Sequence, residues 1–195
     1  MSTLAATNIK NASSATTNLV LDTSGNVTGG GTIADSTAVI RPLVSGTAVN
    51  STSGTAIDFT SIPSWAKRIT VGLNGVSISS TAHIRLQLGT GGTPTTTGYV
   101  SNSTNLGTGA TTLNSTSGFD IYLGVAAASI CGSVYFTNIS GNIWTCSGMI
   151  AYGGATGTAT VGGVVTLSGL LNIVRLTSSS GTDTFDAGSV NILWE

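Results

Sequence analysis

Alternation of apolar and polar residues between positions 55 and 89 constrains the fold of this chain more than any other feature of its sequence. In the runs Ile69–Leu73 and Ile84–Leu88 every second residue is large and apolar, and the residues between them are polar or glycine. A period of two is typical of a β-strand with one buried face and one wet face. The runs therefore predict two half-buried strands, Arg68–Ile78 and Ala82–Leu88.

Within the first of these strands the apolar phase shifts by one residue at Asn74-Gly75. Such a shift requires either a tight Asn-Gly turn or one extra residue in the strand, which is a β-bulge. We favour the bulge, because Ser79–Ala82 offers a better place for the chain to reverse. Before the strand, Ile62–Trp65 is expected to form a corner, since proline fixes φ and a tryptophan side chain supplies apolar cover.

The rest of the chain predicts an all-β protein whose main domain, residues 43–195, is an antiparallel β-sandwich. Strand-like runs recur with turns between them, and no helical periodicity extends beyond two turns, which indicates two stacked sheets. Thr90–Gly118 consists largely of Gly, Thr, Asn and Ser, and it is predicted to be a long connection of the kind that is functional or ordered by a partner. The expected strands lie near Leu43–Ala48, Ala56–Thr60, Arg68–Ile78, Ala82–Leu88, Phe119–Leu123, Ser133–Ile139, Asn142–Tyr152, Gly162–Ser168, Leu171–Thr177 and Phe185–Trp194.

Residues 1–42 are predicted to form a short β-rich segment for attachment or oligomerisation. Asn18–Asp22, Thr23–Asn26 and Val27–Thr28 have the pattern of a strand, a turn and a second strand. The segment is too short to bury a core alone, so other chains must cover its apolar residues. Either three copies intertwine or the segment docks on another protein, and Gly29–Gly31 is expected to be a flexible joint. The residues assigned to attachment and oligomerisation are Ile9, Leu19, Leu21 and Val27.

Charge is scarce in this sequence, and its scarcity argues against some classes of partner. Asp, Glu, Lys and Arg make up 7% of the chain, against roughly 25% in ordinary soluble domains. The net charge of −1 argues against nucleic acid, which requires a basic stripe. No apolar run is long enough to span a bilayer, so membrane insertion is not expected. A surface with so little charge repulsion associates easily, which favours an assembly.

The sequence offers few groups for catalysis, and no cofactor is expected. His83 is the single histidine and no nucleophile signature accompanies it, so we interpret it as a surface or turn residue. Glycoside cleavage requires a pair of carboxylates, whereas Asp120 stands alone in the sequence. Asp183 and Asp186 are either turn residues, which we favour, or ligands of a Ca²⁺ ion whose shell is completed by carbonyl oxygens. The sequence therefore predicts a protein that is not an enzyme.

Cys131 and Cys146 flank a hairpin whose predicted turn is Ser140-Gly141. This register pairs residue 131 with residue 150 and places the two sulfur atoms about 13 Å apart along the strands. That separation exceeds the reach of a disulfide. Both cysteines are therefore expected to be free thiols.

Three aromatic residues are candidates for a binding surface. Trp144 and Trp194 lie in predicted strands, where packing in the core is favoured over exposure. The strand that contains Trp194 is expected to be paired within a sheet. Tyr99 lies in the Thr90–Gly118 connection, and it is predicted to be exposed because its neighbours are too small to bury it. Tyr99 either stacks on a sugar ring, which would make it a receptor contact, or anchors the loop.

Three segments of the sequence resemble parts of bacteriophage virion proteins. FTSIPSWAKRITVGLNGVS, followed by the short strand IRLQLG, is similar to a domain that recurs in tail-fibre and other structural proteins of tailed phages. VRLTSSSGTDTFDAGSVNILWE resembles the end of the same domain, and NIKNASSATTNLVLDTSGNVTGG is similar to a short β-rich head of many phage fibre proteins. The resemblance also favours a jelly-roll order of the strands.

The resemblance and the residues together predict a structural protein of the virion that is made in the cytoplasm of the host bacterium. We favour a short homotrimeric tail fibre that is attached to other virion proteins by its N-terminal segment. Its sandwich is then an outward knob that contacts a polysaccharide or another receptor on the host surface. The alternative is a capsid decoration or cement protein that stabilises the head.

Overall fold

The computed structural model describes residues 43–195 apart from residues 108, 109, 124, 127 and 155–156. Of residues 1–42 it describes five short strands and Thr23. The chain divides into two compact units, Met1–Pro42 and Leu43–Glu195, which we call the first unit and the sandwich.

The first unit contains two small groups of antiparallel strands. A three-stranded sheet consists of β1 (Asn8–Ile9), β2 (Leu19–Leu21) and β3 (Val27–Thr28), and a separate pair consists of β4 (Ile33–Ala34) and β5 (Val39–Ile40). The predicted strand, turn and strand are confirmed, since Leu21 pairs with Val27. Ile9 and Leu19 belong to the same sheet, and the attachment role of these four residues stays a prediction. Gly29–Gly31, the predicted joint, lies outside the described residues.

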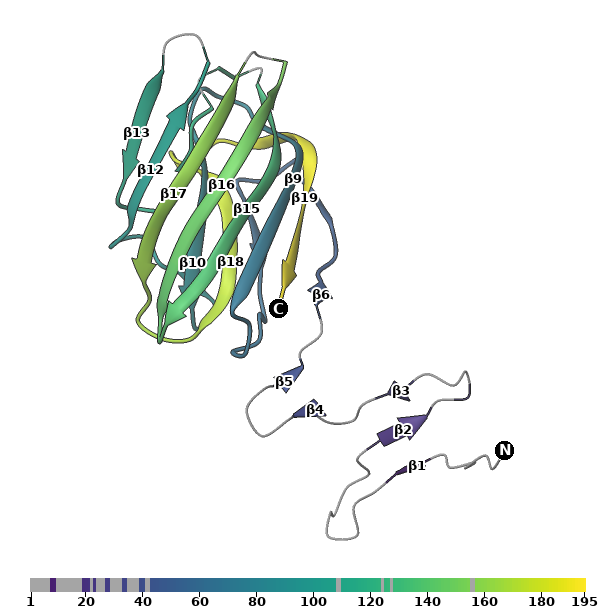
Figure 1. The fold of residues 1–195 in the computed structure, drawn as a ribbon. Helices are drawn as coiled ribbons and strands as arrows, with labels where there is room; N and C mark the ends of the chain where they lie inside the picture. The colour runs from purple at the N-terminus through teal and green to yellow at the C-terminus, as the bar shows by residue number, and fades with distance from the viewer. Residues whose placement is uncertain are drawn as a thin grey trace. The chain divides into compact units, whose positions relative to one another are not determined.

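The sandwich consists of two antiparallel sheets that lie face to face, as Figure 1 shows, and the predicted all-β fold is confirmed. The larger sheet has nine strands in the order β13-β12-β17-β16-β15-β9-β19-β6, with β7 also paired to β19. The smaller sheet has five strands in the order β11-β10-β18-β8, with β14 also paired to β10. Within the described part of the chain, no helix has the length and apolar character needed to cross a membrane.

The strand boundaries agree closely with those expected from the sequence. Each expected strand of the main domain has a counterpart whose ends differ by at most four residues, and Leu43–Ala48 becomes the short strand β6 followed by β7. The jelly-roll order stays a prediction. The strands of the larger sheet are β6 (Val44–Ser45), β7 (Val49–Asn50), β9 (Arg68–Ile78), β12 (Val100–Asn105), β13 (Thr111–Ser115), β15 (Ser129–Ser140), β16 (Ile143–Gly153), β17 (Thr158–Thr166) and β19 (Phe185–Trp194). Those of the smaller sheet are β8 (Ala56–Phe59), β10 (Ile84–Thr90), β11 (Thr93–Pro94), β14 (Phe119–Ile121) and β18 (Leu171–Ser178).

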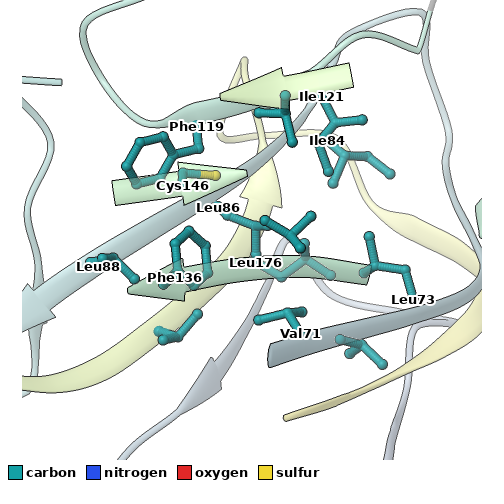
Figure 2. Packing of buried hydrophobic residues seen from close by; sticks show 14 of the residues in the cluster. Val71, Leu73, Ile84, Leu86, Leu88, Phe119, Ile121, Phe136, Cys146 and Leu176 are labelled. Carbon is teal, nitrogen blue, oxygen red and sulfur yellow. The ribbon is translucent and has the colours of Figure 1, made fainter. Parts of the chain in front are cut away.

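The core lies between the two sheets, where every second side chain of each long strand points inward. Phe136 of the larger sheet packs against Phe119 of the smaller sheet, with ring centroids 5.5 Å apart. Burial of one large apolar side chain stabilises a fold by about 1.5–3 kcal/mol, so this layer supplies most of the stability. Figure 2 shows members of the cluster from both sheets, among them Val71, Leu73, Cys146, Ile84, Leu86, Leu88, Ile121 and Leu176.

The corner and the strand-to-strand reversal are confirmed. The Ala66 N–H donates to the Pro63 carbonyl at 3.0 Å, which closes the corner, and Trp65 packs against the core. The chain then reverses between β9 and β10, at the predicted Ser79–Ala82.

The predicted bulge in β9 is also confirmed. The strand runs through Asn74-Gly75 without a break, and its pairing with β15 places Gly132 opposite Leu73 but Ile130 opposite Val76. One residue of β15 is thus opposed by two residues of β9, and the pairing of β9 with β19 shifts in the same region.

Gly75 lies in this bulge, and Gly132 of β15 and Gly188 of β19 lie beside it. Gly75, Gly132 and Gly188 have φ values of 63°, 146° and 93°, which side chains rarely allow. A Cβ atom on Gly188 would lie 2.4 Å from the carbonyl carbon of Gly75. The two backbones therefore approach each other more closely than any other residue at position 188 permits.

The connection Thr90–Gly118 differs from its prediction, because it contains the short strand β11 and the β12–β13 hairpin. This hairpin extends the larger sheet, since β12 pairs with β17 along its whole length. The inward residues of β12 are Ser101 and Ser103, which are 3% and 1% exposed. A strand that buries serines has no apolar alternation, and the sequence pattern therefore does not reveal it.

Both cysteines are free, as expected, although the predicted register of their hairpin is one residue wrong. Cys131 pairs with Ala151 rather than with residue 150, because the turn falls at Gly141-Asn142 and Ile139 is an extra residue in β15. Cys146 points into the core, and burial raises the pKa of its thiol above the ordinary range. The Sγ atom of Cys131 instead accepts the Gly75 N–H at 3.2 Å.

We predict that Gly188→Ala destabilises the sandwich and that Gly72→Ala does not. A residue held in a sparsely populated backbone conformation costs about 1–3 kcal/mol, and the new methyl group also collides with Gly75. One kcal/mol lowers the melting temperature of a domain of this size by about 2–4 °C. A Cβ atom on Gly72 meets no atom closer than 4.0 Å. Thermal melts followed by circular dichroism compare the two variants, and equal melting temperatures would contradict the close approach at the bulge.

Candidate binding surfaces

The structure buries Tyr99, so its predicted exposure is wrong, and of the two roles considered for it the burial favours the loop anchor over stacking on a sugar ring. Only 1% of the residue is exposed. Its hydroxyl accepts the Leu88 N–H at 2.9 Å and lies 3.1 Å from the carbonyl oxygens of Leu88 and Thr95. Its ring meets Phe119 edge-on with centroids 4.9 Å apart, and burial raises the pKa of the phenol. Tyr99 therefore fastens the start of β12 to β10.

His83 follows a turn, as interpreted, but it is packed rather than free. Its Nδ1 atom accepts the Leu123 N–H at 3.2 Å, and its ring stacks on Tyr122 with centroids 5.0 Å apart. Burial lowers the pKa of the imidazole, an effect that Asp120 opposes and Arg85 reinforces. The neutral imidazole thus holds the chain that follows β14, which is a structural task.

The carboxylates that the sequence offers for catalysis or metal binding each interact with a different residue. Asp120 forms an ion pair with Arg85, while Asp183 and Asp186 accept hydrogen bonds from the hydroxyls of Ser180 and Ser77. The Ser180 hydrogen bond lowers the pKa of Asp183. Among the described residues, no three His, Cys, Asp or Glu side chains gather closely enough to hold a metal ion. Asp183 lies in the connection between β18 and β19, whereas Asp186 lies in β19, so the interpretation of Asp186 as a turn residue is wrong.

Five neighbouring strands of the larger sheet, β13, β12, β17, β16 and β15, contain no charged residue. We call the outward side of these strands the uncharged face. The inward side chains next to Tyr135 and Met149, such as Phe136 and Ile150, are fully buried, so strand alternation turns Tyr135 and Met149 outward. Two adjacent rows across this face are Tyr135, Ser147, Gly162 and Asn102, and Ser133, Met149, Thr160 and Thr104.

Large apolar side chains stand exposed on the uncharged face. Met149 is 65% exposed, Val100 63% and Tyr135 42%. Hydroxyl and amide groups surround them, so the face is wettable without being charged. Contiguous exposed apolar patches commonly mark sites of protein–protein contact, and Tyr135 and Met149 are diagonal neighbours on β15 and β16. The uncharged face is therefore a candidate for contact with another protein.

The charged residues of the sandwich lie outside these five strands, although Lys67 reaches the end of β15, where its Nζ donates to the Asn138 Oδ1 atom at 3.0 Å. Arg68 pairs with Glu195 at the start of β9, with 2.8 Å between Nε and Oε1. On the outward side of the smaller sheet, Arg85 pairs with Asp120 and Arg175 pairs with Asp58. The two sheets thus present surfaces of different chemistry.

A polar groove of about 260 Å³ opens on the outward side of the smaller sheet. Strands β10 and β18 form its floor, where Arg85 lies opposite Thr177 and Gln87 lies opposite Arg175. The turn after β18 contributes part of its wall. The lining residues are Thr55, Ala56, Arg85, Gln87, Thr96, Arg175, Thr177 and Ser178–Gly181.

Both arginines of the polar groove are fixed by forked ion pairs. Arg85 donates from Nε and Nη2 to the Asp120 carboxylate at 2.6 and 2.8 Å, and from Nη1 to the Ser179 carbonyl at 3.1 Å. Arg175 donates from Nε and Nη2 to Asp58 at 2.7 and 2.6 Å. The hydrogen bonds to Asp58 raise the pKa of Arg175. Forked pairs of this kind fix the plane of the guanidinium.

The two tryptophans considered for binding belong to the packing of the sandwich. Trp144 is 4% exposed and lies in the core, as favoured from the sequence. Trp194 is partly buried against the core and lies in β19, which is paired with β9 as expected. Trp194 also lines a hollow of about 410 Å³ together with Asp58 and Ser45.

The residues of the polar groove do not stand out in the sequence as a site. Their single signal is the polar phase of two strands, with Arg85 and Gln87 in β10 and Arg175 and Thr177 in β18. Which polar residue lies opposite which depends on strand pairing across about ninety residues of chain, and local patterns do not encode it.

Comparison of the chain with protein-family models, with curated proteins and with solved structures finds no match.

We predict that His83 makes stability depend on pH below neutrality. Because the folded state favours the neutral imidazole, the unfolded chain binds more protons as the pH falls through its own pKa of about 6.5. The free energy of unfolding therefore decreases between pH 7.5 and 5.5. Urea denaturation at several pH values measures the slope, which His83→Gln should abolish. An identical slope in both proteins would contradict the burial of His83.

Proposed function

We propose that this chain is a non-enzymatic structural protein of a tailed-bacteriophage virion, with the form of a short homotrimeric tail fibre. The first unit attaches the fibre to other virion proteins, and the sandwich is the outward knob that contacts the host surface. The observation that carries the proposal is the uncharged face, five neighbouring strands wide. The sequence resemblance to phage fibre proteins supplies the virion context.

The uncharged face suits burial against further copies of the sandwich. Burying a charge without a partner costs several kcal/mol, and ordinary surfaces carry such charges at roughly every fourth position. The uncharged face carries none, so two copies can bring it together without repulsion or an unpaired charge. Met149, Val100 and Tyr135 then supply apolar contact. Packing around a three-fold axis turns this face of each copy towards its neighbours.

The short strands of the first unit also support a role in attachment and in contact between copies. Its sheets consist of strands of two or three residues, which are marginal without cover from elsewhere. Ile9, Leu19, Leu21 and Val27 are the apolar residues of these strands that another chain would cover. We assign that cover to the other copies of the first unit and to the virion protein on which they dock.

A non-enzymatic role is favoured by what the candidate catalytic groups already do. His83 accepts a backbone hydrogen bond, and Asp120 is locked in a forked pair with Arg85. A general base must be free to accept a proton from a substrate. Neither residue is in that position.

A capsid decoration protein is the alternative, and copy number separates the two roles. A fibre is present in tens of copies per particle, whereas a decoration protein covers the head in hundreds. Quantitative gels or electron cryomicroscopy of purified virions count the copies directly. Hundreds of copies on the head would replace the fibre by the decoration protein, and absence from the virion would contradict both.

We also predict that a chain beginning at Leu43 remains folded but does not join particles. The sandwich has its own core, whereas the attachment role is assigned to residues 1–42. Circular dichroism measures the fold of the truncated chain, and complementation of a phage that lacks the gene measures its incorporation. Normal incorporation of a folded truncated chain would contradict the assignment.

A further inference from the structure

We propose that the polar groove binds a neutral, polyhydroxylated ligand, which is a saccharide of one or two rings. The inference rests on the proposed function for the source of the ligand, a host surface. The groove alone supplies the chemistry that would recognise the ligand. Three features of the groove carry it: a buried polar floor, unused donors on fixed arginines, and the cancellation of charge.

The floor of the groove is polar although it is buried. Gln87 is 6% exposed, Thr177 7% and Ser178 1%. Gln87 is held by donating from Nε2 to the Ser117 carbonyl at 2.8 Å, and Thr177 by donating to the Thr55 carbonyl at 2.8 Å. These side chains are fixed before any ligand arrives, and fixed groups lose little entropy on binding.

The arginines retain donors for a ligand. A guanidinium has five N–H groups, and Arg175 uses two of them on Asp58 while its side chain is 34% exposed. Arg85 is less exposed, at 16%, and marks the deeper end of the groove. Thr96 and Ser180 also line the groove, and the Ser180 hydroxyl is held by Ser178, Thr182 and Asp183. The groove therefore combines guanidinium donors with hydroxyl groups, which both donate and accept.

The cancellation of charge selects a neutral ligand over an anionic one. Each guanidinium is matched by one carboxylate, Arg85 by Asp120 and Arg175 by Asp58. An anion would gain from the arginines but would lose by repulsion from carboxylates a few ångströms away. A sugar hydroxyl both donates and accepts, so it matches neighbouring guanidinium, amide and hydroxyl groups without a change in charge. The volume of about 260 Å³ lies just below the range of small-molecule pockets, which begin at roughly 300 Å³, so the groove holds at most one or two rings of a longer saccharide.

The test measures sugar binding to the full chain in solution. Maltohexaose, cellohexaose, mannohexaose and N-acetylchitohexaose are the neutral probes, and hexagalacturonic acid is the anionic probe. Saturation-transfer NMR detects binding, and calorimetry gives the affinity. We expect at least one neutral probe to bind, and we expect Arg175→Met to weaken that binding at least fivefold.

Arg68→Met is the matched control, because Arg68 forms an exposed ion pair with Glu195 away from the groove. It should leave the affinity unchanged. Thr96→Ala, at an exposed position of the groove wall, should weaken binding even if Arg175→Met fails to fold.

Three results would overturn the inference. They are binding of none of the neutral probes, binding of the anionic probe alone, and binding that neither Arg175→Met nor Thr96→Ala weakens. Particle assembly does not enter this measurement. If no sugar binds to the groove, the proposed virion role is therefore unaffected. If the protein is absent from virions, the proposal that the groove binds sugar is unaffected.

Discussion

Burial of one apolar face on every long strand is the interaction on which the rest of this structure depends. With charge confined to 7% of the chain, ion pairs contribute little, and the core between the two sheets must supply the stability. Alternation then decides the surface as well, because each residue between two buried ones points outward. The composition of the outward phase therefore sets what each side of the sandwich can bind.

The two outer sides differ for this reason. The outward phase of β15, β16 and β17 holds hydroxyls, small residues and a few exposed apolar side chains. That of β10 and β18 instead holds arginine, glutamine and threonine, with Asp58 and Asp120 on the flanking strands. One side suits burial against protein, and the other suits hydrogen bonding to a polar ligand. A protein that assembles through one sheet and binds through the other keeps its ligand site open.

The sequence alone predicts the structure of this protein well wherever the residues of a single strand show an apolar–polar pattern. The phase shift at Asn74-Gly75 predicts the bulge, and alternation predicts the expected strands. Prediction from the sequence fails where a structure depends on pairing with a distant strand, or where the inward residues of a strand are polar. Strand β12 buries Ser101 and Ser103 instead of apolar residues, so its sequence shows no alternation. Tyr99 is buried by Leu88 of β10 and Phe119 of β14, which are not its neighbours in the sequence. The extra residue Ile139 moves the cysteine hairpin by one position, and the polar groove exists only once β10 pairs with β18.

Assembly through the uncharged face is the central claim. The mass in solution of the chain that begins at Leu43 tests it most directly, because this chain lacks the first unit, which is also assigned to contact between copies. Ser147 lies between Tyr135 and Gly162 near the middle of the face and is exposed. Ser147→Asp places an unpaired charge there, whereas Ser168→Asp places one on an exposed turn outside it. Sedimentation equilibrium of this shortened chain should show trimers without a substitution and with Ser168→Asp, and monomers with Ser147→Asp and an unchanged melt. A monomeric shortened chain without a substitution, or a Ser147→Asp variant that still forms trimers, would contradict the claim.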